Sequence, residues 1–385
     1  MVDVQVEGRV RAALARVIDP EIRKPITELD MVGSVAVDHA GHAVVQIKLT
    51  IVGCPAARAI ERDVTAAVLE TQGVASAEIV VGVMTPTERA ALTEKLRGGK
   101  AARTMPFGPG SLTRVFAITS GKGGVGKSTL TANLAVALAE QGLAVGVIDA
   151  DVYGFSIPGI LGLVQDGVAA APTRVDDMIL PPVAYGVKAI SIGMFLDPAK
   201  GASGSAVAWR GPMLHRTLNQ FLTDVYFGDL DVLLLDLPPG TGDMAISVGQ
   251  LLPNAEVIVI TTPQPAAAEV AERSGTVARQ TGQQLFGVVE NMAGLRQPDG
   301  SVLELFGSGG GAEVASRLSA GQDAPVPLLA SVPFSVRLRA SGDEGTPIVL
   351  EAPQDPASIA IRSVAERIAH EGRGLAGRSL GIAPV

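Results

Sequence analysis

Apolar residues recur at two different spacings along the first hundred residues. Helical spacing over residues 3–18 stops at Asp19-Pro20, because a proline disfavours helix at the residue before it. Apolar and more polar side chains alternate over residues 45–51, which predicts a hairpin spanning residues 33–51. The pattern then predicts a helix over 55–71, a strand over 76–83 and a short helix over 86–96. Together these elements predict a small α/β domain over residues 1–97.

A different pattern begins after residues 98–113, which are rich in Gly, Pro, Lys and Arg and which we interpret as a linker. Apolar strands are expected at 115–119, 144–149, 187–193, 231–236, 256–262, 284–291 and 326–331. Helices are expected between them at 127–141, 213–224, 243–252, 265–281 and 310–319. Buried strands that alternate with helices predict an α/β fold with a mostly parallel sheet covered on both faces. This second domain would span residues 114–370, followed by a tail over residues 371–385.

The amino-acid composition of the chain disfavours nucleic acids and membranes as binding partners. The chain has 385 residues, 47% of them hydrophobic, and a net charge of -8, which does not favour binding to nucleic acid phosphates. No apolar run reaches the roughly 18–20 residues of a membrane span, and the N-terminus lacks a signal-peptide pattern. Cys54 is the only cysteine, which excludes an intrachain disulfide and a zinc site of several thiolates. We therefore expect a cytoplasmic protein with neither a nucleic-acid nor a membrane partner.

The first predicted strand of the second domain leads into a glycine-rich loop and then a helix. The segment from Gly121 to Ser128 fits the phosphate-loop pattern G-x-x-x-x-G-K-[ST]. The expected nucleotide-binding residues are Gly121, Lys122, Gly123, Gly124, Val125, Gly126, Lys127, Ser128 and Thr129. Backbone N–H groups of such a loop wrap an anion, while Lys127 would reach the β- and γ-phosphates of ATP and Ser128 would coordinate Mg²⁺.

The same loop also satisfies G-x-G-x-x-G, the fingerprint of dinucleotide-binding folds, and Asp149 follows at about the ribose-binding offset. A dinucleotide fold does not require Lys127-Ser128, however. A second acidic loop begins with Asp236 at a distant strand end, as expected for a residue that holds Mg²⁺ beside a phosphate loop. The two features together favour an ATPase.

The segment Asp149-Ala150-Asp151, at the end of the predicted strand 144–149, carries two carboxylates. Residues two apart on an extended chain point the same way, so both side chains would face the same site. Beside a bound nucleotide, one could orient the attacking water while the other holds the water shell of the metal. Capping of the next turn is the alternative for either residue.

Several strings, taken together, resemble the Mrp/ApbC iron–sulfur carriers within the ParA/MinD-like ATPases. The chain carries the extra loop lysine Lys122, DADVYGFSIP at 149–158, WRGPM at 209–213, DLPPGTGD at 236–243 and ENM at 290–292. The N-terminal strings DPEI at 19–22, ITELDMV at 26–32 and LTIVGCP at 49–55 are similar to the small domain fused to bacterial members. The resemblance covers essentially residues 115–350 plus this small domain.

This resemblance implies roles that the residues alone do not show. Lys122 would cross a homodimer interface to the partner's ATP, Asp151 would handle the attacking water, and Arg210 could contact nucleotide or the partner copy. Asn291 would recognise adenine, with the backbone near Pro333 closing over the base. ATP would clamp the dimer, and hydrolysis would change its grip on a 4Fe–4S or 2Fe–2S cluster destined for client or scaffold proteins.

The chain departs from the family where the cluster is usually held. Typical members carry a Cys-x-x-Cys pair soon after the ENM string, whereas residues 293–301 here contain neither cysteine nor histidine. Cys54 precedes a predicted helix, a position that lowers a thiol pKa and exposes the sulfur. Two copies of Cys54 in a dimer would supply half of the usual four thiolates, unless Cys54 is simply a structural residue.

Other functions stay open at this point. A partitioning ATPase of the ParA/MinD type would need a basic patch or a basic amphipathic helix, and the charges from Asp355 onward are mixed. An assembly ATPase that does not itself hold a cluster is a further alternative. A metabolic ligase or kinase would require an added acceptor molecule for turnover.

Overall fold

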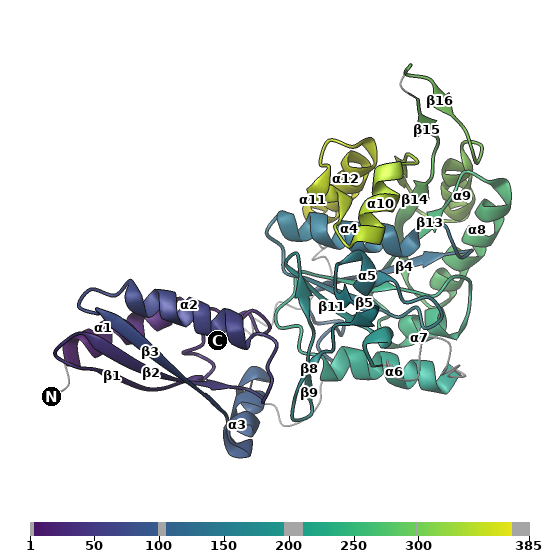
Figure 1. Cartoon of the computed structure of the whole chain (residues 1–385). Coiled ribbons are helices and arrows are strands. Elements are labelled where there is room, and N and C mark those ends of the chain that lie inside the picture. The colour runs from purple at the N-terminus through teal and green to yellow at the C-terminus, as the bar shows by residue number, and fades with distance from the viewer. Residues whose placement is uncertain (1–3, 99–104, 196–210, 298, 372–385) are drawn as a thin grey trace, which may run out of the picture. The chain divides into compact units, whose positions relative to one another are not determined.

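The computed structural model describes residues 4–98, 105–195, 211–297 and 299–371. It divides into two compact units, each drawn in Figure 1. Unit 1 comprises Met1–Pro106, Ala170–Val183 and Gln220–Gly228, and unit 2 comprises Phe107–Ala169, Ala184–Asn219 and Asp229–Val385. Within the described residues, no helix has both the length and the apolar character needed to cross a bilayer.

Unit 1 contains a three-stranded sheet with helices packed on it. Its N-terminal elements are α1 (Val4–Leu14), β1 (Val32–Val37), β2 (His42–Leu49), α2 (Ala57–Leu69), β3 (Ser76–Val83) and α3 (Pro86–Leu96). β1 and β2 pair antiparallel and β2 and β3 parallel, so the predicted hairpin is confirmed. Thr85 and Glu88 form a capping box before α3, and Pro86 occupies its first turn, which explains why a helix begins there.

Two features of unit 1 differ from the sequence prediction. α1 ends at Leu14 rather than residue 18, and the Asp19 carboxylate accepts hydrogen bonds from the backbone N–H groups of Glu21 (2.9 Å) and Ile22 (2.8 Å), which closes a turn. The core of the unit also includes a hairpin from much later in the chain, β8 (Thr173–Val175) and β9 (Met178–Leu180). Local periodicity cannot reveal such a long-range contribution.

Unit 2 is built on an eight-stranded sheet in the order β10-β11-β5-β12-β4-β13-β14-β17. Its strands are β4 (Arg114–Ser120), β5 (Val145–Asp149), β10 (Val183–Ala184), β11 (Val187–Ser191), β12 (Val232–Asp236), β13 (Glu256–Thr261), β14 (Gln284–Asn291) and β17 (Leu328–Val332). From β11 to β17 every neighbouring pair is parallel. The predicted parallel α/β fold is therefore confirmed.

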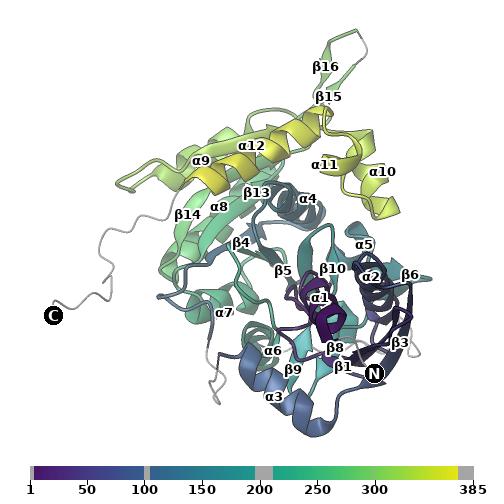
Figure 2. The same cartoon turned by 90° about the vertical axis from the view of Figure 1, so that its left-hand side faces the viewer.

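Helices cover both faces of this sheet. The major helices of unit 2 are α4 (Lys127–Glu140), α7 (Asp243–Leu251), α8 (Pro265–Gln280), α9 (Gly310–Ser319), α10 (Val336–Glu344) and α12 (Pro356–His370), while α6 (Gly211–Asp224) begins in unit 2 and ends in unit 1. Short helices α5 (Ile157–Ile160), η1 (Ile192–Phe195) and α11 (Ile348–Glu351) complete the set in the described part. α4 and α12 lie on one face and α7, α8 and α9 on the other (Figures 1 and 2), as right-handed crossovers require.

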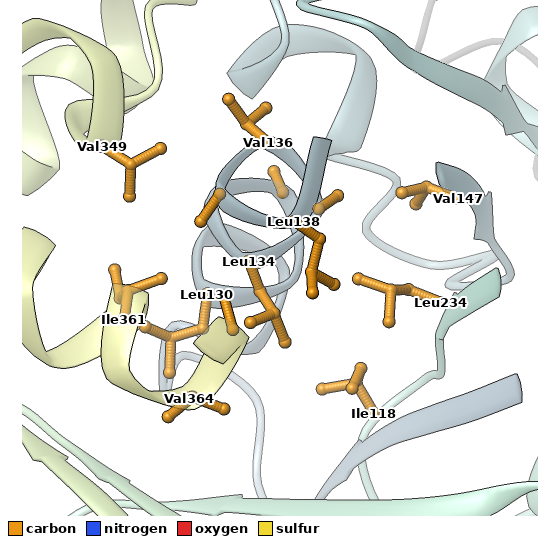
Figure 3. Packing of buried hydrophobic residues seen from close by; sticks show 14 of the residues in the cluster. Ile118, Leu130, Leu134, Val136, Leu138, Val147, Leu234, Val349, Ile361 and Val364 are labelled. Atoms are coloured by element: carbon orange, nitrogen blue, oxygen red, sulfur yellow. The ribbon is translucent and has the colours of Figure 1, made fainter. Parts of the chain in front are cut away.

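The helix that follows the phosphate loop lies in the centre of the core. Figure 3 shows Leu130 and Leu134 of α4 packed between the sheet and the side chains of Ile361 and Val364 on α12. The packing leaves an apolar cavity of about 20 Å³ between these residues and the sheet. Because burial is nearly complete around α4, its first turn has little freedom to move.

Candidate functional site

The carboxyl ends of the adjacent strands β5 and β12 bring the predicted acidic residues Asp149 and Asp236 together. In the sheet register Asp236 of β12 lies opposite Asp149 of β5 on one side and Ile118 of β4 on the other. Ser191 of β11 lies opposite Asp149 on the far side. Residues from four separated segments therefore meet at one sheet edge, beside the loop that leaves β4.

Two glycines of the loop have backbone angles that other residues avoid. Gly124 and Gly126 have φ values of 77° and 81°, in the left-handed region. Gly121 is fixed for a different reason, since a Cβ at that position would lie 2.4 Å from the backbone of α8. Across the loop, the Gly240 N–H donates to the Ser120 carbonyl at 2.7 Å, which ties the second acidic loop to the phosphate loop.

Lys127 lies among the carboxylates of the site. Its Nζ is 2.8 Å from Asp236 Oδ1 and 3.8 Å from Asp151 Oδ2, while its side chain is only 6% exposed. The ammonium thus balances buried negative charge that would otherwise be costly to keep from water. The same group can reach the phosphates of a nucleotide in the loop.

Asp236 is fully buried and accepts hydrogen bonds from two hydroxyls of α4. Ser128 Oγ donates to its Oδ2 at 2.5 Å, and Thr131 Oγ1 donates to its Oδ1 at 3.0 Å. A hydroxyl and a carboxylate in contact are hard oxygen donors of the kind that Mg²⁺ prefers. These residues fit the predicted magnesium site. Thr131 was missed by the sequence analysis, although its position three residues after Ser128 places it on the same helix face.

Asp149 is buried completely and is held by three donors. They are the Ser191 hydroxyl at 3.0 Å and the backbone N–H groups of Asp151 and Ile157 at 3.2 and 3.3 Å. Burial, with the nearby charge of Asp236, raises the pKa of the Asp149 carboxyl well above its usual range. Ser191 was also missed, and its only sequence signal is its place within the predicted strand 187–193.

Asp151 lies at the entrance to the loop after β5. Its Oδ1 accepts hydrogen bonds from the backbone N–H groups of Tyr153 (3.2 Å) and Gly154 (3.1 Å), so the turn positions the carboxylate. The other oxygen faces Lys127 at 3.8 Å. Asp151 therefore caps the next turn with one carboxylate oxygen, which was the predicted alternative, and places the other oxygen beside Lys127.

Of the residues implied by the resemblance, Asn291, Pro333 and Lys122 lie at or just after the ends of their strands or in the phosphate loop. Asn291 ends β14 and donates from Nδ2 to the Val125 carbonyl at 2.8 Å. Pro333 follows Val332, which is opposite Asn291 in the register with β17. Lys122 is partly exposed on the loop, where its carbonyl accepts a hydrogen bond from Ser120 Oγ. Arg210 falls outside the described residues.

Cys54 does not have the exposed, acidic thiol that was predicted. The residue is 6% exposed, and its Sγ donates to Glu21 Oε2 at 3.7 Å. Burial, followed by the charge of Glu21, raises its pKa to about 11. The prediction was wrong because α2 begins only at Ala57, while the half-buried carboxylate of Glu21 lies beside the sulfur. Among the described residues, no group of three His, Cys, Asp or Glu side chains could hold a metal ion.

Alkylation of Cys54 is expected to be slow in the folded protein. With the pKa near 11, about one thiol in a thousand is a thiolate at pH 8, which is roughly a hundredfold less than at the ordinary value of 9.0. Iodoacetamide modification followed by mass spectrometry should show this difference between native and urea-unfolded protein. Glu21→Gln should accelerate the native reaction, because it removes a charge that opposes the thiolate. Equal native and unfolded rates would contradict the burial of the sulfur.

The stretch that replaces the usual cysteine pair forms a hairpin. β15 (Leu295–Arg296) pairs antiparallel with β16 (Val302–Leu303) and extends away from the sheet of unit 2 (Figure 1). Its second strand exposes Val302 and Leu303. The segment lacks thiolate and imidazole donors, so a cluster has no ligand there.

The phosphate loop on a parallel sheet, with a lysine, a serine and two strand-end aspartates around it, defines a P-loop NTPase. The family model described as NUBPL iron-transfer P-loop NTPase matches residues 111–369, and a model of iron–sulfur cluster assembly proteins matches residues 7–81. The chain belongs to this family of iron-transfer P-loop NTPases.

Curated relatives extend the similarity over the whole chain. An iron–sulfur cluster carrier protein of Mycobacterium tuberculosis is 52% identical over 99% of this chain and 98% of its own length. A carrier of the same name from Bacillus subtilis is 36% identical over 85% of this chain and 88% of the relative. Among solved structures, a nucleotide-binding protein from Archaeoglobus fulgidus with ADP is 35% identical, covers 60% of this chain and 86% of its own, and has a TM-score of 0.47.

Proposed function

We propose that this protein is an ATP-binding and ATP-hydrolysing iron–sulfur cluster carrier that acts as a nucleotide-clamped homodimer. The observation that carries the proposal is the position of Lys127, between Asp236 and Asp151 at the start of the helix that follows the phosphate loop. The names of the relatives support the choice of cargo, since relatives that match along nearly the whole chain are called iron–sulfur cluster carriers.

The chemistry proposed for the site is phosphoryl transfer to water. Backbone N–H groups of the loop and the Lys127 ammonium would bind the β- and γ-phosphates. Ser128 would hold Mg²⁺ directly, with Asp149 and Asp236 holding its water shell. When bound, Mg²⁺ supplies positive charge against the phosphate oxygens.

Asp151 is the residue proposed to act on the attacking water. Its carboxylate would accept a proton as the water oxygen bonds to the γ-phosphorus and the bond to the ADP oxygen breaks. The backbone N–H groups that hold Oδ1 leave Oδ2 on the side of Lys127, so the acceptor oxygen is next to the phosphate-binding group. Lys122 would reach the ATP of the second copy, and Asn291 with the backbone at Pro333 would enclose the base.

The chain offers few residues that could bind the iron–sulfur cluster. Each chain has one cysteine, so a dimer would offer two copies of Cys54 to a cluster that is usually held by four. Buried thiols must also lose their protons to bind iron, and the raised pKa of Cys54 opposes this. We therefore propose that the remaining ligands come from a client protein or a small thiol and that the hold is brief.

Anaerobic reconstitution tests the cargo. The purified protein and its Cys54→Ser variant are incubated with iron, sulfide and a small thiol, and iron content and visible absorption are measured with and without Mg-ATP. We expect a cluster in the parent protein that is lost in Cys54→Ser. No cluster in either protein, with ATP turnover intact, would instead favour an assembly ATPase that does not carry the cluster itself.

A further inference from the structure

The side chain of Asn291 contacts the phosphate loop rather than open solvent. Its Nδ2 donates to the Val125 carbonyl at 2.8 Å, and the residue is only 4% exposed. The two residues are 166 positions apart in the chain, so this contact joins the end of β14 to the loop after β4. Within the part of the chain that the structure describes, no other side chain donates to the Val125 carbonyl.

Gly126 allows this contact to form. A Cβ at position 126 would lie 2.3 Å from Asn291 Nδ2, a distance that no pair of such atoms adopts. The backbone at Gly126 also has a φ of 81°, which a side chain would strain. The amide of Asn291 therefore packs directly against the loop, in space that exists because residue 126 is glycine.

The strand that carries Asn291 is held firmly. The neighbouring Glu290 accepts hydrogen bonds from the Gly311 N–H at 2.9 Å and from the Ser331 hydroxyl at 3.0 Å. Asn291 itself is in register with Val332 of β17. An amide on such a strand can fix the position of the group that it contacts.

The orientation of the Val125 carbonyl matters for anion binding. A phosphate loop binds its ligand with backbone N–H groups, so each carbonyl of the loop must turn away from the phosphates. Val125 is buried, and a buried carbonyl without a donor is costly. Asn291 supplies that donor from Nδ2 and so holds the carbonyl oxygen toward the end of β14.

We propose that Asn291 is a positioning residue for the phosphate loop, which it holds in its anion-binding conformation through the Val125 carbonyl. The inference rests on the proposed nucleotide-binding function and adds to the base contact implied by family resemblance. An asparagine amide has a second N–H and an acceptor oxygen, so one side chain can serve the loop and the base together.

A ligand without a base separates the two roles. Binding of Mg-tripolyphosphate, Mg-ATP and Mg-GTP to the parent protein and to Asn291→Ala is measured by titration calorimetry. We expect Asn291→Ala to weaken tripolyphosphate about tenfold, as for a buried group left unpaired. An unchanged tripolyphosphate affinity, with loss of the preference for ATP over GTP, would show a base contact only and overturn the inference.

Asn133→Ala is the matched control. Asn133 is also buried, and its Nδ2 donates to the Thr129 carbonyl of α4 at 2.9 Å, outside the turn at Val125. Its loss should lower the melting temperature without changing tripolyphosphate affinity. If Asn291→Ala does not fold, Asn291→Leu nearly keeps the volume, has no donor for the Val125 carbonyl, adds no charge beside the loop and carries the same comparison. A parent protein that binds neither ATP nor tripolyphosphate would instead contradict the proposed function itself.

Discussion

Lys127→Ala should lower ATP turnover at least about a hundredfold, the loss typical when a charged donor to a developing transition-state charge is removed. The ammonium is the cation nearest to Asp236, and the loop presents it at the start of α4. Phosphate release with saturating Mg-ATP provides the measurement. Turnover equal to that of the parent protein would contradict the ATPase assignment.

The same substitution should also affect stability, and this must be separated from catalysis. Without Lys127, the buried carboxylates of Asp236 and Asp151 lose their nearest cation, which costs about 3–5 kcal/mol for a buried pair broken on one side. Lys127→Arg is the control because it keeps the charge but places a broad guanidinium where a narrow ammonium fits. We expect Lys127→Arg to have a higher melting temperature than Lys127→Ala and to remain inactive. Activity in Lys127→Arg would mean that charge alone, rather than its placement, suffices.

Gly121→Ala should destabilise the protein by about 1–3 kcal/mol, the usual cost of overpacking, and abolish nucleotide binding. The added Cβ would lie 2.4 Å from both the Ala271 nitrogen and the Val270 carbonyl carbon, which are backbone atoms of α8. Because a helix backbone cannot move aside as a flexible side chain can, either the loop or α8 must shift. Urea unfolding and ATP binding together measure the effect.

Gly123→Ala controls for the effect of a methyl group in the loop. A Cβ there would have Pro239 Cγ as its nearest neighbour at 3.9 Å, an ordinary van der Waals distance. Its unfolding free energy should stay within about 1 kcal/mol of the parent protein. Equal destabilisation of the two variants would mean that general loop flexibility, rather than packing on α8, dictates glycine at position 121.

Much of the fold could be predicted because the relevant signals are local. Each of the seven predicted strands of unit 2 is present in the parallel sheet, with boundaries that differ by only a few residues. Buried parallel strands are apolar throughout and the helices between them keep their own period, so neither signal depends on distant residues. The short strands and helices between Ile157 and Ala184 were not predicted, since segments of two to four residues carry no measurable period.

The residues of the candidate site likewise fall into those that the sequence predicts and those that it does not. The glycine spacing of the loop, Lys127-Ser128 and the strand-end positions of Asp149 and Asp236 are visible in the chain, and their convergence follows from parallel topology. The contacts of Thr131, Ser191 and Asn291 are not visible, because each depends on a partner from another element. Hydrogen bonds between residues 42 to 166 positions apart leave no trace in local spacing.

By itself, the sequence determined the class of the protein: the phosphate loop, the alternation of strands with helices and the absence of a second cysteine are all local facts. Only the tertiary structure decided the state of Cys54, since burial beside Glu21 makes a thiolate costly, whereas the position before a helix alone had indicated the opposite. It also decided that Lys127 is enclosed by carboxylates and that Asn291 lies against the phosphate loop. The physical reason is common to all three, because burial and the partners of a polar group are properties of the folded chain.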